Sequence, residues 1–210
     1  MFITFEGIEG CGKTTQVKRL VNRLNEIAIP VISTLEPGAT KIGLNIRRLL
    51  LDSGNQDIAP LTELLLYAAD RAQHVREIIK PALEQGNWVI CDRFTDSTMV
   101  YQGYARGQDM ELIEILNEKA SQDIRPDLTI LLDCPVEIGL ARALERNEAF
   151  LDDSQDRFER EKKVFHETVK KGYLSQARRE YDRFLVIDGT LKEHELEEII
   201  FEHVRPLINI

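Results

Sequence analysis

The chain has 210 residues, of which 43% are hydrophobic and 30% charged, a composition typical of a globular protein with a substantial core. Its formal net charge of −9 argues against non-specific binding to nucleic acid or to an anionic membrane surface. An anionic substrate must therefore meet a local cluster of positive side chains. We find no internal repeat, low-complexity tract or linker, so residues 1–210 are expected to form one domain.

The cysteines, histidines and apolar runs exclude further classes of protein. Cys11, Cys91 and Cys134 are too widely spaced for a metal site and indicate a reducing compartment. The four histidines are isolated, and we interpret them as solvated or partly buried helix residues. No apolar run approaches the ~20 residues of a membrane-spanning helix, and the N-terminus lacks the layout of a signal peptide. We therefore expect a cytoplasmic protein.

Five short β-type runs alternate with longer helical patterns along the chain. Several runs are continuously apolar and β-branched, which is typical of strands covered on both faces. The expected strands are 2–6, 30–36, 87–92, 127–134 and 183–188. The expected helices are 13–28, 42–52, 61–85, 110–122, 136–146, 156–181 and 192–205. This alternation predicts an α/β fold, a doubly wound five-stranded parallel sheet flanked by helices.

The segment GIEGCGKT at 7–14 follows the first strand and opens the first helix. It matches the phosphate-binding pattern G-x-x-x-x-G-K-[ST] of P-loop proteins. Its backbone N–H groups and the helix N-terminus would surround the phosphates of ATP. Lys13 would reach the β- and γ-phosphates, and the Thr14 hydroxyl would bind the accompanying Mg²⁺. The expected phosphate-binding residues are Gly7, Ile8, Glu9, Gly10, Cys11, Gly12, Lys13 and Thr14.

The end of the third strand distinguishes between classes of P-loop protein. A GTPase needs an N-K-x-D segment, and NEKA at 117–120 has the wrong order and lies in a predicted helix. A transport or motor ATPase usually has a longer chain and an acidic Walker-B strand end. Here the third strand also ends in an acid, Asp92, but Arg93 follows it directly. Because ligands bind outside the carboxyl ends of the strands in such a sheet, Arg93 is placed for a second phosphate. The pattern favours a kinase whose acceptor is itself a phosphate.

Three further segments carry a specific resemblance to a known family. They are EPGAT at 36–40, LLLYAADRAQHV at 64–75 and DRFTDSTMVYQGYARG at 92–107. Together with the P-loop, they resemble the signature segments of the thymidylate kinase family, nucleoside-monophosphate kinases that make dTDP from dTMP and ATP. The similarity extends to VIDGT at 186–190. It implies an enzyme of dTTP synthesis that uses ATP, dTMP and Mg²⁺.

The resemblance also implies roles for residues of the acceptor site. Glu9 would face the 3′-hydroxyl of the acceptor sugar or the magnesium shell, which gives a reason for a carboxylate inside a phosphate-binding loop. Tyr67 would stack on thymine, and Arg71, four residues later on the same helix face, would donate to its O4. Arg93 would bind the acceptor phosphate. Further implied contacts to dTMP come from Glu36, Pro37, Arg47 as a second phosphate clamp, Ser97, Thr98, Gln102, and Tyr101 against the sugar's 2′ position.

Residues 141–161 resemble the family's lid. Some members carry the transition-state arginine in the P-loop, but here Gly10 follows Glu9, so the resemblance implies the lid-arginine type of many bacterial members. Arg142 would then bind the ATP phosphates. The expected catalytic residues are Lys13, Arg93, Arg146 and Arg157. The chain departs from the family at Leu35 and Ala39, where arginine and glycine are common, so an arginine near the acceptor is absent.

Two alternatives to dTMP phosphorylation stay open. The first is a kinase for another nucleotide or a deoxynucleoside, and the second is a nucleotide-binding switch or assembly ATPase subunit without turnover of a small molecule. Residues 60–69 are apolar nearly all round, more than one core-facing stripe requires, and together with the resemblance they predict a homodimer. No nucleic-acid or membrane partner is expected.

Overall fold

The computed structural model describes residues 1–150 and 157–209, except for the side chains of 146–150 and 209. Its centre is a five-stranded parallel sheet in the order β2-β3-β1-β4-β5. The strands are β1 (Phe2–Glu6), β2 (Val31–Leu35), β3 (Trp88–Asp92), β4 (Leu128–Asp133) and β5 (Phe184–Asp188). Every predicted strand is found within one residue of its expected ends, and the predicted α/β fold is confirmed.

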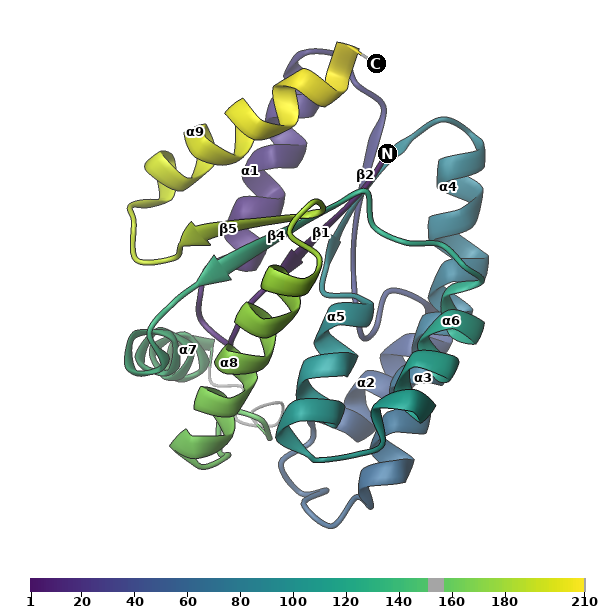
Figure 1. Ribbon diagram of the computed structural model, residues 1–210, viewed down its shortest axis with the longest axis vertical. Helices are drawn as coiled ribbons and strands as arrows, with labels where there is room; N and C mark the ends of the chain where they lie inside the picture. The colour runs from purple at the N-terminus through teal and green to yellow at the C-terminus, as the bar shows by residue number, and fades with distance from the viewer. Residues whose placement is uncertain (151–156, 210) are drawn as a thin grey trace.

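Helices cover the sheet on both faces (Figure 1). The α-helices are α1 (Lys13–Glu26), α2 (Lys41–Leu51), α3 (Pro60–His74), α4 (Lys80–Glu84), α5 (Thr95–Thr98), α6 (Met110–Ser121), α7 (Val136–Phe150), α8 (Lys163–Arg179) and α9 (Glu193–Val204). Two π-helical segments, η1 (Val75–Ile79) and η2 (Met99–Ala105), and the 3₁₀ segment η4 (Arg205–Asn209) complete the list. Helix α1 packs on β1, β2 and β3 and against α9, whereas α8 packs on β4 and β5.

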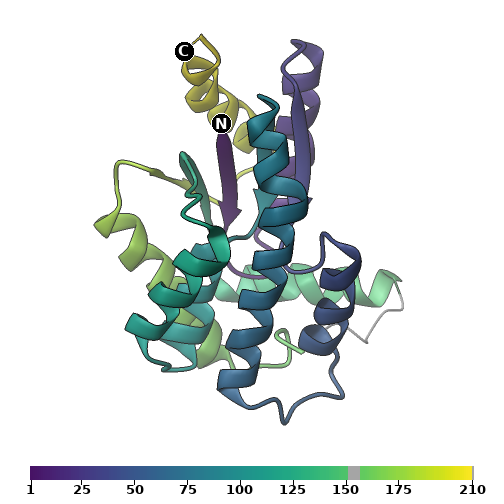
Figure 2. The same cartoon turned by 90° about the vertical axis from the view of Figure 1, so that its right-hand side faces the viewer.

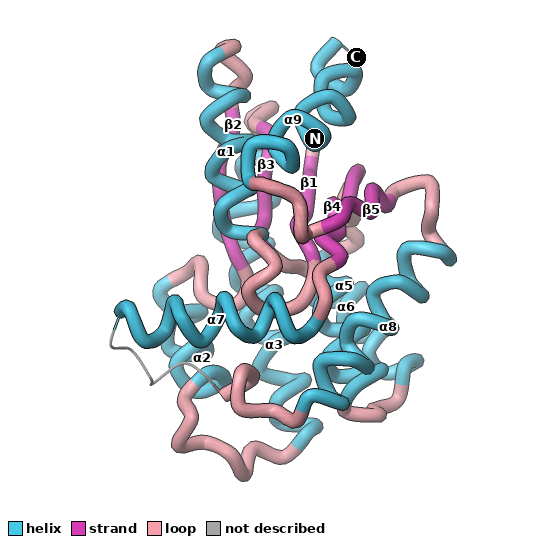
Figure 3. Tube along the Cα trace, turned by 90° about the vertical axis from the view of Figure 1, so that its left-hand side faces the viewer, coloured by secondary structure: helices cyan, strands magenta, loops and turns pink. Residues whose placement is uncertain are grey.

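The strand order sets where a ligand can bind. From β1 the chain crosses to β2 on one side and later, through β3, to β4 on the other, so β1 lies at the point where the direction reverses. Ligands of doubly wound sheets bind in the crevice outside the strand ends at this point. The P-loop leaves β1 there, and α7 lies against it, since the ideal Cβ position of Gly10 falls within 3.0 Å of the Ala143 nitrogen. Figure 3 shows α7 crossing below the ends of the strands.

Of the helical predictions, the one at 61–85 is confirmed as one rod of α3, η1 and α4 that continues past Pro81 (Figure 2), whereas two others need correction. The wider π turn of this rod directly before Pro81 offers room for a ring that would otherwise press on the preceding turn. Residues 95–105 form α5 and η2, although the sequence predicted no helix there. The helix expected from residue 156 begins only at Lys163, and the Arg157 backbone N–H instead donates to the carbonyl oxygen of Leu51.

The interpretation of the histidines was wrong for two of them. His74 and His166 are fully buried, and each lies against a carboxylate. Isolated histidines in helical patterns carry no sign of such partners, because the partners come from other elements. Among the described residues, no helix is both long enough and apolar enough to cross a membrane. The cytoplasmic location stays a prediction.

Candidate active site

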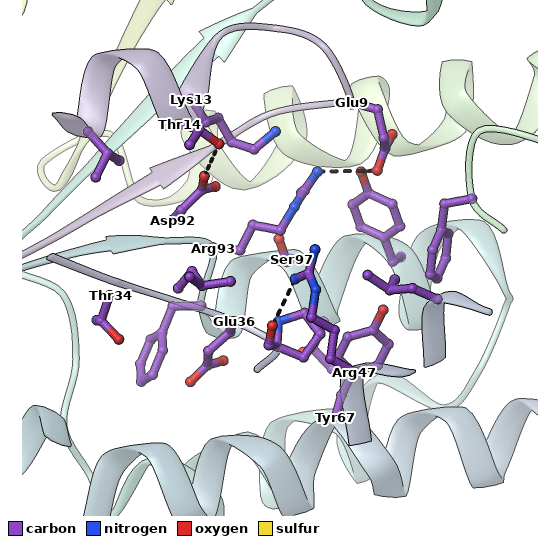
Figure 4. Close-up of a pocket in the computed structure, with 18 of the residues that line it drawn as sticks. Glu9, Lys13, Thr14, Thr34, Glu36, Arg47, Tyr67, Asp92, Arg93 and Ser97 are labelled. Atoms are coloured by element: carbon purple, nitrogen blue, oxygen red, sulfur yellow. Dashed lines mark hydrogen bonds and ion pairs between the residues drawn. The ribbon is translucent and has the colours of Figure 1, made fainter. Parts of the chain in front are cut away.

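A cavity of about 560 Å³ lies at the carboxyl ends of β1, β2 and β3. Side chains from the P-loop, from the end of β2, from α2 and α3, and from the segment after β3 surround it (Figure 4). The sequence-predicted residues that line it are Glu9, Gly10, Lys13, Thr14, Glu36, Pro37, Arg47, Tyr67, Arg71, Arg93, Ser97, Thr98, Tyr101 and Gln102. The other P-loop residues, Gly7, Ile8, Cys11 and Gly12, do not line it. One cavity thus joins the predicted donor and acceptor sites.

The backbone of the P-loop requires glycine at its turns. Gly7, Gly10 and Gly12 have φ of 139°, 67° and 100°, a region that disfavours other residues. A Cβ atom on Gly10 would lie 1.9 Å from the carbonyl oxygen of Gly139 on α7. This contact excludes a side chain at the position where some relatives of the predicted family carry an arginine. The need for positive charge must be met from elsewhere in the chain.

Lys13 and Thr14 face the donor side of the cavity. The Lys13 ammonium donates to the carbonyl oxygens of Gly7, at 3.0 Å, and Ile8, at 2.8 Å. The Thr14 hydroxyl donates to a carboxylate oxygen of Asp92 at 2.6 Å, as Figure 4 shows. Asp92 ends β3, which pairs directly with β1, so the sheet register places this carboxylate beside the P-loop. The pair presents hydroxyl and carboxylate oxygens, the ligand atoms that Mg²⁺ prefers.

Glu9 points away from Thr14 and toward the acceptor side. Its Oε1 accepts from the Tyr101 hydroxyl at 2.6 Å and from Arg93 at 3.2 Å. Its Oε2 lies 3.4 Å from Nδ1 of His166. Burial raises the pKa of Glu9, but the contact with His166 and the charge of Arg93 outweigh it and hold the pKa below its usual range. Glu9 is therefore an ionised acceptor at neutral pH.

Arg93 lies between the donor and acceptor sides. Its backbone has φ of 73°, a conformation fixed by hydrogen bonds from its N–H to Phe5 and from the Cys91 thiol to its carbonyl oxygen. Its Nη1 donates to the hydroxyls of Ser97 and Tyr173, both at 3.1 Å. Burial lowers its pKa, but the surrounding tyrosines and glutamates raise it well above the usual value. Arg93 is a permanent cation inside the cavity.

Arg71 is held by four protein acceptors and is almost fully buried. Its Nε donates to Glu36 at 2.9 Å and its Nη1 to Asn117 at 2.6 Å. Its Nη2 donates to the Phe94 carbonyl oxygen at 3.0 Å and to Thr98 at 2.9 Å. A guanidinium has five N–H donors, so these bonds leave one on Nη1. Arg71 nonetheless lines the cavity.

The remaining residues on the nucleoside side come from α2 and α3. His74 bonds through Nδ1 to Glu36 and through Nε2 to Thr34, at 2.9 and 2.6 Å, and this fixes the carboxylate that holds Arg71. Arg47, from α2, donates to the carbonyl oxygen of Pro37 at 2.8 Å (Figure 4). Tyr67 forms part of the wall, and burial raises its pKa, so it is a neutral aromatic ring.

The structure brings only part of the predicted lid to the cavity. Arg157 is buried in an ion pair with Glu63 and donates to the carbonyl oxygen of Leu50, and it does not line the cavity. Arg142, on α7, donates to the carbonyl oxygen of Gly189 at 3.2 Å. The side chain of Arg146 lies outside the described residues. Within 141–161, the described residues lining the cavity are Phe158 and Glu159.

Sequence reasoning missed three residues that shape the site. Asp92 was considered only as the neighbour of Arg93, although an acid that ends a strand beside the P-loop strand was a usable signal. His166 gave no signal, because its partner Glu9 is distant in the chain. Glu6 received no role, yet it is fully buried and bonded to Ser97.

Comparisons with known proteins identify the family of the chain. The model of the thymidylate kinase family matches residues 5–200. Thymidylate kinase of Geobacter sulfurreducens is 59% identical over 188 residues, 90% of this chain and 88% of that one. That of Desulfosudis oleivorans is 57% identical over 190 residues, 90% and 89% of the two chains. The crystal structure of thymidylate kinase from Ehrlichia chaffeensis superposes with a TM-score of 0.79 at 35% identity, covering 98% of both chains. The chain belongs to the thymidylate kinase family.

Proposed function

We propose that the chain transfers the γ-phosphoryl group of ATP to dTMP and so produces dTDP for dTTP synthesis. The observation that carries this proposal is the position of Arg93. It lines the same cavity as Lys13 of the P-loop and Tyr67 of the nucleoside wall. A kinase with a phosphorylated acceptor needs a fixed cation between its two substrates, because both carry several negative charges.

Transfer in this cavity requires positioning and charge neutralisation, not a general base. The acceptor phosphate of dTMP is ionised near neutral pH, so its oxygen can attack in line without losing a proton. The P-loop N–H groups, Lys13 and the lid arginines Arg142 and Arg146 would bind the ATP side. Arg93, with Arg47 as a second clamp, would bind the acceptor phosphate.

The residues beside the P-loop fit Mg²⁺. The Thr14 hydroxyl and the Asp92 carboxylate are hard oxygen donors 2.6 Å apart, and together with ATP phosphates they suit this ion. We therefore assign the metal to Thr14 and Asp92. Glu9 was the other predicted metal residue, but its bonds to Arg93 and Tyr101 favour a role toward the acceptor sugar. When bound, Mg²⁺ would neutralise charge on the transferred group.

The nucleoside side offers the groups that would select thymine. Tyr67 provides a neutral ring for stacking, and Arg71 retains one N–H donor for the O4 oxygen of the base. Glu36 and His74 hold Arg71 in place, and Thr98 and Gln102 line the adjacent wall. The hydroxyl of Tyr101 is held by Glu9, where its ring would obstruct a 2′-hydroxyl and favour deoxyribose.

A homodimer would cover an exposed apolar surface formed by α2, α3 and α6. On α3, Leu61 and Leu65 are 50% and 47% exposed and lie one helical turn apart. Leu49 on α2 and Ile115 on α6 are 51% and 49% exposed, and both helices pack on α3. Exposed apolar side chains on neighbouring helices are typical of interfaces. This supports pairing of two copies through these helices.

One assay separates the proposal from its alternatives. ADP release from ATP is measured with dTMP, dUMP, dCMP, dGMP, AMP and thymidine as acceptors. The proposal expects rapid turnover with dTMP, and preference for another acceptor would support a different kinase. If no acceptor raises ATP turnover above its basal rate, a nucleotide-binding switch is the better interpretation.

A further inference from the structure

Glu6 is a buried carboxylate directly behind the cavity. It ends β1, one residue before the P-loop, and is fully buried. Its Oε1 accepts from the backbone N–H of Phe94 at 2.8 Å. Its Oε2 accepts from the hydroxyls of Ser97 and Tyr173, at 2.6 and 2.8 Å. Neither Glu6 nor Tyr173 lines the cavity, so neither is placed to touch a substrate there.

The two hydroxyls bound to Glu6 are the same two that Arg93 uses. A hydroxyl has one proton and two lone pairs. Because the hydroxyls of Ser97 and Tyr173 both donate to Glu6, their lone pairs remain available to accept from Nη1 of Arg93, which donates to each at 3.1 Å. Glu6 thereby fixes the direction in which both hydroxyls accept, and the hydroxyls fix one end of the guanidinium.

The other end of the Arg93 guanidinium is left for a ligand. Nη1 donates to the two hydroxyls and Nη2 donates once to Glu9, so among the described residues two N–H donors, on Nε and Nη2, have no acceptor. Two donors on one guanidinium suit the oxygens of a phosphate. The protein therefore holds the guanidinium of Arg93 through Nη1 and leaves one N–H on Nε and one on Nη2 to bind a phosphate.

We propose that Glu6 is a positioning residue for the acceptor phosphate, which it serves through Ser97, Tyr173 and the guanidinium of Arg93. This rests on the proposed function, in which Arg93 binds the phosphate of dTMP. Burial and the nearby Asp96 raise the pKa of Glu6 to about 7, and the charge of Arg93 lowers it. The relay requires the ionised carboxylate, which predominates above about pH 7 and is stabilised by the charge of Arg93.

The substitution Glu6→Gln keeps the shape but removes this pattern of acceptors. A carboxamide has one acceptor oxygen and one donor NH₂ group, whereas Glu6 accepts on both oxygens. In either orientation, a donor of the amide meets the Phe94 N–H or the two hydroxyls. At least one side of the relay must rearrange, and Arg93 loses its fixed direction. The affinity lost in Glu6→Gln therefore depends on whether the ligand has a phosphate.

The test compares binding of dTMP and of thymidine by calorimetry at about pH 8, where Glu6 is ionised, in the parent, Glu6→Gln and Asp96→Asn proteins. Glu6→Gln is expected to weaken dTMP binding about ten- to a hundredfold and to leave thymidine binding within about twofold. The KM for ATP is expected to stay unchanged. Asp96→Asn is the matched control, because Asp96 is a buried carboxylate bonded to Arg183 and not to Arg93. Removing the charge of Asp96 lowers the pKa of Glu6, so at pH 8 Glu6 stays ionised and this variant should preserve the dTMP-to-thymidine ratio whatever its effect on stability.

Two further variants decide the outcome if Glu6→Gln does not fold. Tyr173→Phe removes one hydroxyl of the relay and adds no polar group, and it should weaken dTMP binding selectively by about three- to tenfold. In an Arg93→Ala background, Tyr173→Phe should have no further effect on dTMP binding, because its route to the phosphate is gone. Equal weakening of dTMP and thymidine would overturn the proposal. If the parent binds neither ligand, the proposed function itself fails.

Discussion

Arg157 and Glu63 form an ion pair in which both side chains are almost completely buried. The pair joins the start of the segment before α8 to α3, and Arg157 also donates to the end of α2. Glu63 in turn accepts from Gln102, a residue of the cavity wall, and from Arg106. In this conformation Arg157 links its own segment to α2 and α3 and does not line the cavity beside the P-loop.

Replacing Arg157 by Ala is therefore expected to cost stability first. It removes a buried cationic partner of Glu63, to which Arg106 also donates, so the free energy of unfolding should fall by about 3 kcal/mol. For a chain of this length, that corresponds to a decrease in Tm of about 6–12 °C. Thermal unfolding without nucleotide measures it. Arg142→Ala, at a half-exposed helix position with one backbone contact, is the control and should change Tm little.

Steady-state kinetics of Arg146→Ala and Arg157→Ala separate the roles of these two lid arginines. Arg146→Ala should lower kcat much more than it raises either KM, on the order of 10³-fold, if it supplies the transition-state charge. If instead Arg157→Ala keeps its Tm and loses kcat to that extent, Arg157 leaves Glu63 during turnover and the original expectation from the sequence holds.

The dimer prediction can be tested by placing a charge on α3. Leu65→Glu puts a carboxylate in the centre of the exposed apolar stripe, where a second copy would have to desolvate it. Sedimentation velocity should then show a monomer for the variant at concentrations where the parent is a dimer. Val164→Glu, at a residue that is 69% exposed on α8, is the control. A parent protein that sediments as a monomer at micromolar concentration contradicts the prediction.

Replacing Lys13 and replacing Arg93 are expected to impair different kinetic constants. Lys13→Ala removes the P-loop ammonium and should lower kcat on the order of 10³-fold. Arg93→Ala should mainly raise the KM for dTMP and leave ATP binding near that of the parent. Both are measured by steady-state kinetics with each substrate varied, together with direct titration of ATP. An equal loss of ATP affinity in the two variants would show that they do not serve opposite phosphates.

The strands and the P-loop could be predicted because their signals are local in the sequence. Continuous apolar runs and the glycine spacing of 7–14 depend only on neighbouring residues, and both predictions match the structure. The relay from Glu6 to Arg93 depends, apart from the contact of Arg93 with Ser97, on contacts across 80 to 167 positions, which no local pattern encodes. Helix 95–105 was missed because its polar residues face the cavity, which breaks the periodicity that indicates a helix.

The raised pKa of Glu6 predicts how stability depends on pH. In the folded chain Glu6 keeps its proton up to about pH 7, whereas the unfolded chain releases it near 4.5. Between these two pH values the folded state binds more protons than the unfolded state. The stabilisation from protonated Glu6 is therefore complete below pH 4.5 and is lost as the pH rises to 7. The loss is on the order of 3 kcal/mol at most.

Urea unfolding at pH 5 and pH 8 measures this difference. The parent should lose more free energy of unfolding between the two values than Glu6→Gln, which has no carboxyl to titrate. Asp70, whose pKa burial raises to about 6, contributes in the same direction in both proteins and cancels from the comparison. Identical losses in the two proteins would mean that Glu6 does not titrate in this range.

Arg71 is expected to select the base of the acceptor nucleotide. If Arg71 uses its remaining N–H for O4 of thymine, dTMP and dUMP should both be phosphorylated. The missing methyl of dUMP should lower kcat/KM about fourfold, since a buried carbon contributes about 0.8 kcal/mol. dCMP presents an amino group to Arg71, so two donors would face each other. Each unsatisfied group costs about 1–3 kcal/mol, which is roughly ten- to a hundredfold per group.

Values of kcat/KM for the three acceptors in the parent and in Arg71→Ala test this. Arg71→Ala should narrow the ratio of dTMP to dCMP by at least about tenfold. Asn117→Ala is the control for lost stability, because Asn117 accepts from Arg71 without lining the cavity and should preserve the ratio. A parent that phosphorylates dCMP as well as dTMP rules out the thymidylate assignment. A ratio unchanged in Arg71→Ala leaves the kinase in place and transfers base selection to the other residues of the wall, with Gln102 the next to replace.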